Sequence, residues 1–62
     1  MDKDLEMQAM KAYLIHKQVF ENWIFGKPVD AWLDDNSDLC VKYADGTWFH
    51  YRYLDTKAPE WW

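Results

Sequence analysis

The sequence predicts an α+β fold, in which one long N-terminal helix packs on a three-stranded antiparallel β-meander and an irregular aromatic C-terminal tail follows. Two observations support this prediction. Apolar residues recur at helical spacing over residues 3–25. Three later runs are rich in β-branched and aromatic residues and are separated by turn residues, and they predict strands at 29–33, 39–43 and 47–54. The 62 residues are expected to form a single domain.

The predicted helix of residues 3–25 has signals at both ends. Asp2 or Asp4 can cap its N-terminus, where acidic side chains also suit the helix dipole. Gly26 is placed to end the helix, and Pro28 prevents it from resuming. One broad apolar stripe is expected to face the sheet, and it consists of Leu5, Ala9, Ala12, Tyr13, Val19, Phe20, Trp23 and Ile24.

Two further features of the helix bear on function. His16 falls inside the apolar stripe, and we interpret it as a histidine at the core edge with one hydrogen-bonded ring nitrogen. Met7, Met10 and Leu14 form a second, narrower stripe on the helix. This stripe either extends the core-facing side or forms a binding surface, because methionine suits both environments.

The lengths of the predicted elements do not match. A helix of about 22 residues spans ~33 Å, whereas strands of about six residues span ~20 Å. Part of the helix should therefore overhang the sheet and leave large apolar side chains uncovered. The tail, residues 55–62, is predicted to be irregular because Pro59 disfavours another element. The cover is expected to come from the terminal Trp61 and Trp62, from a second copy of the chain or from another protein.

The second and third strands are predicted to form a hairpin around Ala44-Asp45-Gly46. A two-residue loop would mix polar groups with the aliphatic ones on one face. A three-residue loop, with Gly46 in the left-handed conformation as a bulge, gives one clean apolar face, and we choose this register. The expected pairs are Tyr43 with Thr47, Val41 with Phe49 and Leu39 with Tyr51.

The first hairpin independently predicts the same inward face. Its turn, Asp34 to Asp38, pairs Leu33 with Leu39 and places Asp30 opposite Lys42. The inner face is then expected to hold Val29, Ala31, Leu33, Leu39, Val41, Tyr43, Phe49, Tyr51 and Tyr53. The outer face is expected to hold two rows, Trp32-Cys40-His50 and Asp30-Lys42-Trp48, with Arg52 near Asp34 and Asp38.

Composition and charge exclude several classes of protein. The chain carries 11 acidic against 7 basic residues, a net charge of −4, which argues against direct binding to nucleic acid. The single cysteine excludes an internal disulfide framework. The N-terminus is too polar and acidic for a secretory signal, and no apolar run reaches membrane-spanning length. A cytoplasmic protein without membrane contact is therefore expected.

Catalytic and metal chemistry finds little support in the sequence, so no enzyme activity, cofactor or metal is predicted. Cys40 and His50 are opposed in the chosen register, but a flat sheet face offers no oxyanion hole. Cys40, His16 and His50 lack close ligand spacing. Asp34, Asn36 and Asp38 resemble the opening of a calcium loop, but Leu39 stands where that loop needs glycine.

The preferred hypothesis is a non-enzymatic protein–protein interaction module that associates with itself, with a larger protein partner, or with both. Aromatic and arginine side chains are the usual anchors of interfaces. The expected anchors are Trp32, Trp48, His50, Arg52, Trp61 and Trp62, with Met7, Met10 and Leu14 as a second surface.

The alternative hypothesis is a small acidic inhibitor, of the kind that phages and mobile elements encode. Its carboxylates would block the basic groove of a nucleic-acid enzyme, and they comprise Asp30, Asp34, Asp35, Asp38 and Asp45. Salt separates the two hypotheses, since groove mimicry should weaken steeply with ionic strength whereas aromatic docking should barely change.

Overall fold

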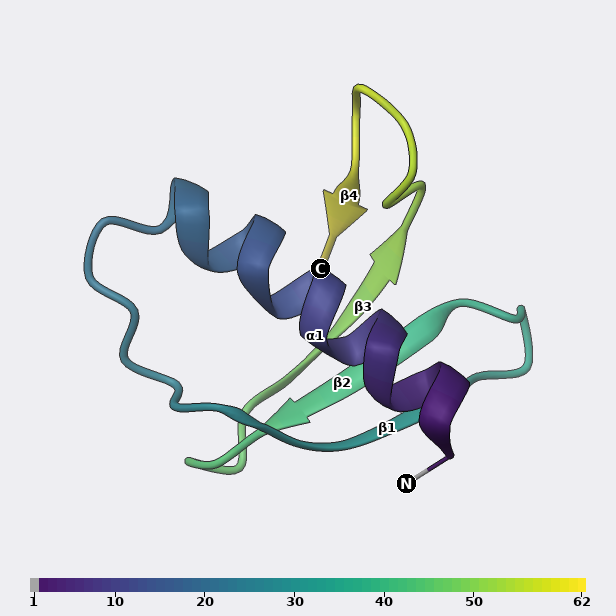
Figure 1. Cartoon of the computed structure of the whole chain (residues 1–62), viewed down its shortest axis with the longest axis horizontal. Coiled ribbons are helices and arrows are strands. Elements are labelled where there is room, and N and C mark those ends of the chain that lie inside the picture. Colours follow the sequence, from purple (N-terminus) through teal and green to yellow (C-terminus); the bar gives the residue numbers. More distant parts are fainter. Residues whose placement is uncertain (1) are drawn as a thin grey trace.

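The computed structural model describes residues 2–62 and confirms the predicted α+β class. One helix, α1 (Lys3–Val19), packs on one face of an antiparallel sheet with strand order β1-β2-β3-β4 (Figure 1). The sheet has four strands rather than the predicted three. Their bounds are β1 (Pro28–Leu33), β2 (Leu39–Tyr43), β3 (Trp48–Arg52) and β4 (Glu60–Trp61).

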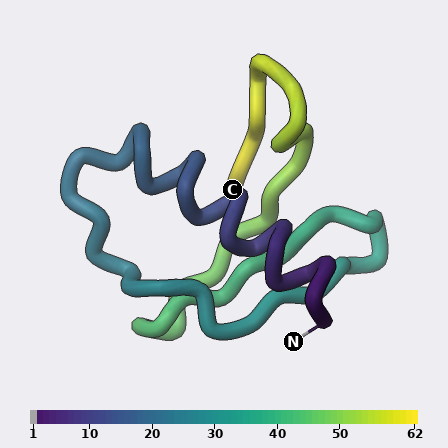
Figure 2. Tube along the Cα trace, in the orientation of Figure 1, coloured from purple at the N-terminus to yellow at the C-terminus, as the bar shows by residue number. Residues whose placement is uncertain are grey.

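The predicted start of the helix is confirmed, whereas its predicted end at residue 25 is wrong. The Asp2 carboxylate accepts hydrogen bonds from the backbone N–H groups of Asp4 and Leu5. At the other end, α1 stops at Val19, and Phe20 already has extended backbone angles. Residues 20–27 then form an extended link that returns the chain to the sheet (Figure 2).

The early end of α1 shortens the predicted overhang. A helix of 17 residues is only about 26 Å long, which is closer to the length of the strands. In the extended link, Trp23 and Phe25 turn back onto the core, and their rings lie 5.0 and 6.5 Å from that of Tyr43. Val19, Phe20 and Ile24, which were expected to face the sheet, are exposed instead, because α1 ends at Val19 and the helical stripe does not continue beyond it.

The link is anchored to the β2–β3 turn by backbone hydrogen bonds. The N–H groups of Ala44 and Asp45 donate to the carbonyl oxygens of Lys27 (2.9 Å) and Phe25 (3.2 Å). Gly26 has φ +84°, and a Cβ atom there would lie 2.8 Å from the Cβ of Ala44. Gly26 therefore does not end the helix as predicted; it permits a close approach of two backbone segments.

This contrast between the two glycines gives a testable prediction. Gly46 also has a positive φ, +94°, but a Cβ there would meet no atom within 4 Å. We expect Gly46→Ala to lower the free energy of unfolding by about 1–2 kcal/mol through backbone strain alone, and Gly26→Ala to lower it by more. Urea denaturation measures both. Adding Ala44→Gly should recover part of the loss in Gly26→Ala, and equal losses for the two glycines would contradict the close contact.

Both predicted hairpin registers are confirmed over most of their length. Across β2 and β3, Cys40 pairs with His50, with Leu39–Tyr51 and Val41–Phe49 on either side. The backbone N–H of Tyr43 donates to the carbonyl oxygen of Thr47 at 2.8 Å, as expected for the three-residue loop. Across β1 and β2 the pairs are Asp30–Lys42, Ala31–Val41, Trp32–Cys40 and Leu33–Leu39.

Three residues predicted for the inner face are exposed, each for a local reason. An irregularity between Pro28 and Asp30 pairs Pro28, not Val29, with Tyr43, and Val29 is left outside the ladder. Leu33 lies at the end of the edge strand β1, where it lines an open cleft rather than the closed core. Tyr53 has φ +61°, which ends β3 and turns the chain away from the sheet.

The tail was predicted to be irregular, but its last residues form β4. Trp61 pairs with Tyr51, and two further backbone hydrogen bonds join Trp62 to His50. The Trp61 ring stacks on His16 with centroids 4.5 Å apart, so the tail closes the core from within the same chain. Pro59 did not exclude a strand because it directly precedes β4 and need not donate to the ladder.

His16 is buried in the centre of the core and begins a chain of hydrogen bonds. Its Nδ1 lies 2.7 Å from the Tyr51 hydroxyl, which lies 2.7 Å from the Tyr43 hydroxyl. Burial lowers the pKa of His16 and raises the pKa of both tyrosines. The predicted single hydrogen-bonded nitrogen is confirmed, although His16 lies deeper than the core edge.

Candidate functional site

Four rings form a continuous row across the outer face of the sheet, with Trp32 on β1, Trp48 and His50 on β3, and Trp62 directly after β4. The rings of Trp32 and Trp48 have centroids 5.4 Å apart, and Trp48 lies 4.9 Å from His50. His50 in turn stacks on Trp62 at 4.8 Å with only 3° between the ring planes. We call these four residues the aromatic row. Strand alternation places them opposite the face that α1 covers.

Arg52 extends the aromatic row at the Trp62 end. Its guanidinium carbon lies 5.0 Å from the centroid of the Trp62 ring, within the range of a cation–π contact. Arg52 also donates two hydrogen bonds to Asp38, from Nε at 2.8 Å and from Nη2 at 2.6 Å. These hydrogen bonds and the positive charge of Arg52 hold the pKa of Asp38 below its usual value. The predicted proximity of Arg52 to Asp38 is confirmed.

The structure divides the predicted tryptophan anchors between two faces. Trp48 and Trp62 are 47% and 49% exposed on the outer face, and Trp32 beside them is half-buried. Trp61 lies on the inner face against His16, so it is not brought together with the other anchors. Once β4 is recognised as a strand, the alternation of side chains along the backbone is enough to place Trp61 and Trp62 on opposite faces.

The second predicted surface lies on α1. Met7 is 72% exposed, and Met10 and Leu14 are exposed as well, so these residues do not extend the core. Met7 and Met10 line a shallow groove with Lys3 and Glu6. Because α1 covers the inner face of the sheet, this stripe is not part of the aromatic row.

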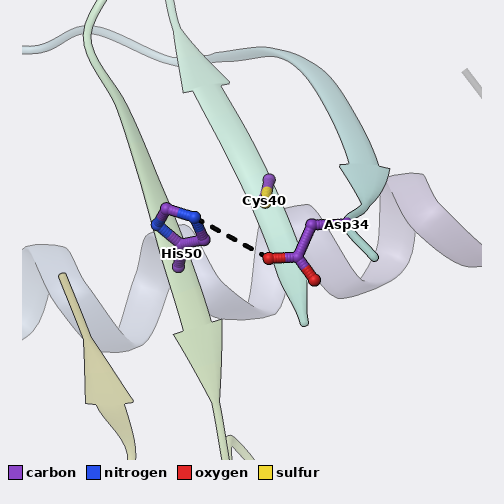
Figure 3. Close-up of side chains that lie close together, drawn as sticks. All are labelled: Asp34, Cys40 and His50. Carbon is purple, nitrogen blue, oxygen red and sulfur yellow. Dashed lines mark ion pairs between the residues drawn. The ribbon is translucent and has the colours of Figure 1, made fainter. Parts of the chain in front are cut away.

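A polar cluster lies beside the aromatic row, and only part of it was predictable from the sequence. Asp34, Cys40 and His50 place one potential ligand atom each within 4.8 Å of the others (Figure 3). The opposition of Cys40 and His50 was predicted, whereas Asp34 was assigned to the turn and expected near Arg52, and its proximity to Cys40 and His50 was not predicted. Asp34 comes two residues after Trp32, so the alternation that places Trp32 on the outer face also places Asp34 there.

Cys40 is fully buried, and without a bound cation its surroundings favour the neutral thiol over the thiolate. Burial raises the pKa of this thiol, and the carboxylates of Asp34 and Asp38 raise it further. Its Sγ lies 3.8 Å from the backbone carbonyl oxygen of Asp38, to which the S–H donates. A neutral thiol is a poor nucleophile, so these surroundings do not favour a catalytic thiolate at Cys40.

Four of the five carboxylates expected to mimic nucleic acid accept hydrogen bonds within the chain, namely those of Asp30, Asp34, Asp38 and Asp45. Asp38 is buried against Arg52, and Asp34 accepts two hydrogen bonds from its own turn. Asp30, Asp35 and Asp45 are exposed. The carboxylates therefore do not form one free acidic array.

Within residues 2–62, no helix has the length and apolar character needed to cross a membrane. Comparison of the chain with protein-family models, with curated proteins and with solved structures finds no match.

Proposed function

We propose that this chain is a cytoplasmic, non-enzymatic module that binds a protein partner through the aromatic row and Arg52. The observation that supports this most strongly is the row itself, four rings in sequence with Trp48 and Trp62 each about half exposed. Contiguous exposed aromatic groups on a folded domain mark interaction surfaces more often than scattered apolar residues do.

The aromatic row is also held rigidly, which favours binding. Trp32, Trp48 and His50 stand on regular strands, and the backbone of Trp62 exchanges hydrogen bonds with that of His50. Arg52 is fixed by its two hydrogen bonds to Asp38. Side chains that are ordered before binding lose little conformational entropy when a partner docks.

Charge favours a different protein over a second copy of this chain. The net charge is −4, and Asp30, Asp35, Asp45 and Glu60 are exposed. Two such acidic surfaces repel each other, whereas a partner with an apolar centre and a basic rim is complementary. We therefore commit to a partner of that chemistry, with self-association as the competing outcome.

The test compares matched variants of the full chain. Proteins retained from cells by the wild-type chain are purified and titrated against it. We expect Trp48→Thr and Trp62→Thr each to weaken the dissociation constant at least about tenfold, as for interface hot spots. Ile24→Thr, which changes an even more exposed apolar side chain in the α1–β1 link, is expected to leave the dissociation constant unchanged.

Three results would count against the proposal. Equal binding by Trp48→Thr and Ile24→Thr would place the interface elsewhere. A dimer mass in light scattering that Trp48→Thr converts to a monomer would make the aromatic row a self-association surface. A steep loss of affinity with rising ionic strength would instead favour the acidic inhibitor, because docking centred on aromatic groups depends weakly on salt.

A further inference from the structure

The polar cluster beside the aromatic row brings together three kinds of metal-binding atom. Asp34 follows β1, Cys40 lies on β2 and His50 lies on β3, and Cys40 stands between the other two (Figure 3). Carboxylate oxygen, thiolate sulfur and imidazole nitrogen are the donor types that Zn²⁺ takes in proteins. Their ligand atoms lie within 4.8 Å of one another.

His50 is oriented for such a role by contacts on its other side. Its Nδ1 lies 3.4 Å from the backbone carbonyl oxygen of Trp62, to which it is placed to donate. Its Nε2 then carries the lone pair and faces Asp34, whose Oδ2 is 3.7 Å away. The stacked Trp62 ring holds the imidazole plane. Metal-binding histidines usually donate their second ring N–H to a carbonyl or carboxylate in this way.

Asp34 is oriented by its own turn. Its Oδ1 accepts hydrogen bonds from the backbone N–H groups of Asn36 and Asp38, both at 2.9 Å. These two bonds occupy one carboxylate oxygen and leave Oδ2 directed at His50. The third donor, Cys40, is fixed at the centre of the sheet by pairing with strands on both sides. All three side chains are therefore positioned by the backbone before any ligand binds.

The spacing fits a bound cation better than a direct contact. At 3.7 Å, the Asp34 Oδ2 and His50 Nε2 atoms are too far apart for a hydrogen bond. Bonds of about 2.0–2.3 Å in a zinc tetrahedron separate neighbouring ligand atoms by roughly 3.3–3.8 Å. Atoms that lie within 4.8 Å of one another thus need to close by at most about 1–1.5 Å to reach tetrahedral spacing.

We propose that Asp34, Cys40 and His50 form a Zn²⁺ site with three protein ligands. The fourth tetrahedral position is left for water or another small ligand. A thiolate and an imidazole disfavour Ca²⁺ and Mg²⁺, which prefer oxygen ligands. On binding, the Cys40 S–H bond breaks, its proton passes to the solvent, and the sulfur electron pair forms the bond to zinc. The site is complete within one chain and does not depend on the proposed protein partner.

The test uses Co²⁺ as a spectroscopic probe with the full-length chain. We expect one equivalent of Co²⁺ to bind, with a sulfur-to-cobalt charge-transfer band and the intense visible absorption of tetrahedral cobalt, and Zn²⁺ to displace it. Cys40→Ser should abolish the charge-transfer band. Asp34→Asn and His50→Gln should each weaken Co²⁺ binding at least about tenfold, whereas the neighbouring, exposed Asp35→Asn should not.

Other results would overturn the proposal. A chain that shows no charge-transfer band in excess Co²⁺ has no such site. A band that persists at full affinity in Asp34→Asn and His50→Gln would mean that cobalt binds the thiol alone. Because a variant can fail to fold, ¹¹³Cd NMR of the wild-type chain provides a second reading. A ¹¹³Cd shift typical of one sulfur donor with nitrogen and oxygen supports the site, and a shift typical of oxygen donors alone rejects it.

Discussion

Replacing Trp61 with alanine is expected to lower the free energy of unfolding by about 3 kcal/mol, a large part of the 5–15 kcal/mol typical of a whole domain. The Trp61 ring stacks on His16 at 4.5 Å and contacts Tyr51, so its removal opens the core above a buried imidazole. Urea denaturation followed by circular dichroism measures the change, since four other tryptophans complicate fluorescence.

Trp62→Ala provides the matched control for this prediction. Trp62 is the adjacent residue and the same type, but it stacks on His50 on the outer face and is 49% exposed. Truncation of Trp62 removes a side chain that is already partly solvated, so it should lower the free energy of unfolding by only about 1 kcal/mol. If the two variants lose equal stability, or if Trp62→Ala loses more, the assignment of Trp61 to the core and Trp62 to the surface is wrong.

The hairpin registers were predictable because a wrong register would place many side chains on the wrong face of the sheet. A slip of one residue moves every side chain of a strand to the opposite face, and here it would exchange Lys42 and His50 with apolar neighbours. Two turns with distinct chemistry, at Asp34–Asp38 and at Gly46, selected the same face independently. The pairing of Cys40 with His50 followed from that register, and so did the placement of Trp32 and Trp48 on the same outer face.

The end of α1 and the existence of β4 were not predictable in the same way. Phe20 and Trp23 continue the helical stripe as well as they fit the extended link, so periodicity does not choose between them. The choice depends on tertiary packing, because in the extended link Trp23 comes within 5.0 Å of Phe25 and Tyr43. A strand of two residues such as β4 has no sequence pattern of its own and exists only beside β3.

In the candidate site as well, the strand pairing was predictable from the sequence, whereas the complete cluster was not. Alternation placed Cys40 opposite His50, but the carboxylate that completes the cluster comes from a residue read as part of a turn. Asp34 serves both roles, because one oxygen closes the turn while the other faces His50. The sequence did contain a signal for this second role, because Asp34 is a turn residue that also continues the outward-facing positions of the preceding strand.

The second large effect expected is a loss of stability as the pH falls below about 6.5, the ordinary pKa of histidine. Burial lowers the pKa of His16 in the folded chain, so the unfolded chain takes up this proton first. Where the unfolded state binds more protons, stability decreases with decreasing pH, at up to about 1.4 kcal/mol per pH unit for one group. The loss from His16 ends once the pH is below its folded-state pKa. Urea denaturation at a series of pH values measures the slope.

His16→Phe should abolish this part of the pH dependence while keeping a ring in the aromatic surroundings of Trp61 and Phe49. Tyr51→Phe is the control, because it removes the hydrogen bond to His16 but leaves the imidazole buried. We expect Tyr51→Phe to be less stable at every pH and to retain the slope. Asp38 contributes to the pH dependence of stability over a different range. Its pKa lies below the usual carboxyl value, so its contribution to the free energy of unfolding is lost only at more acidic pH. A wild-type chain whose stability stays constant from about pH 7 to pH 5 would contradict a buried neutral His16.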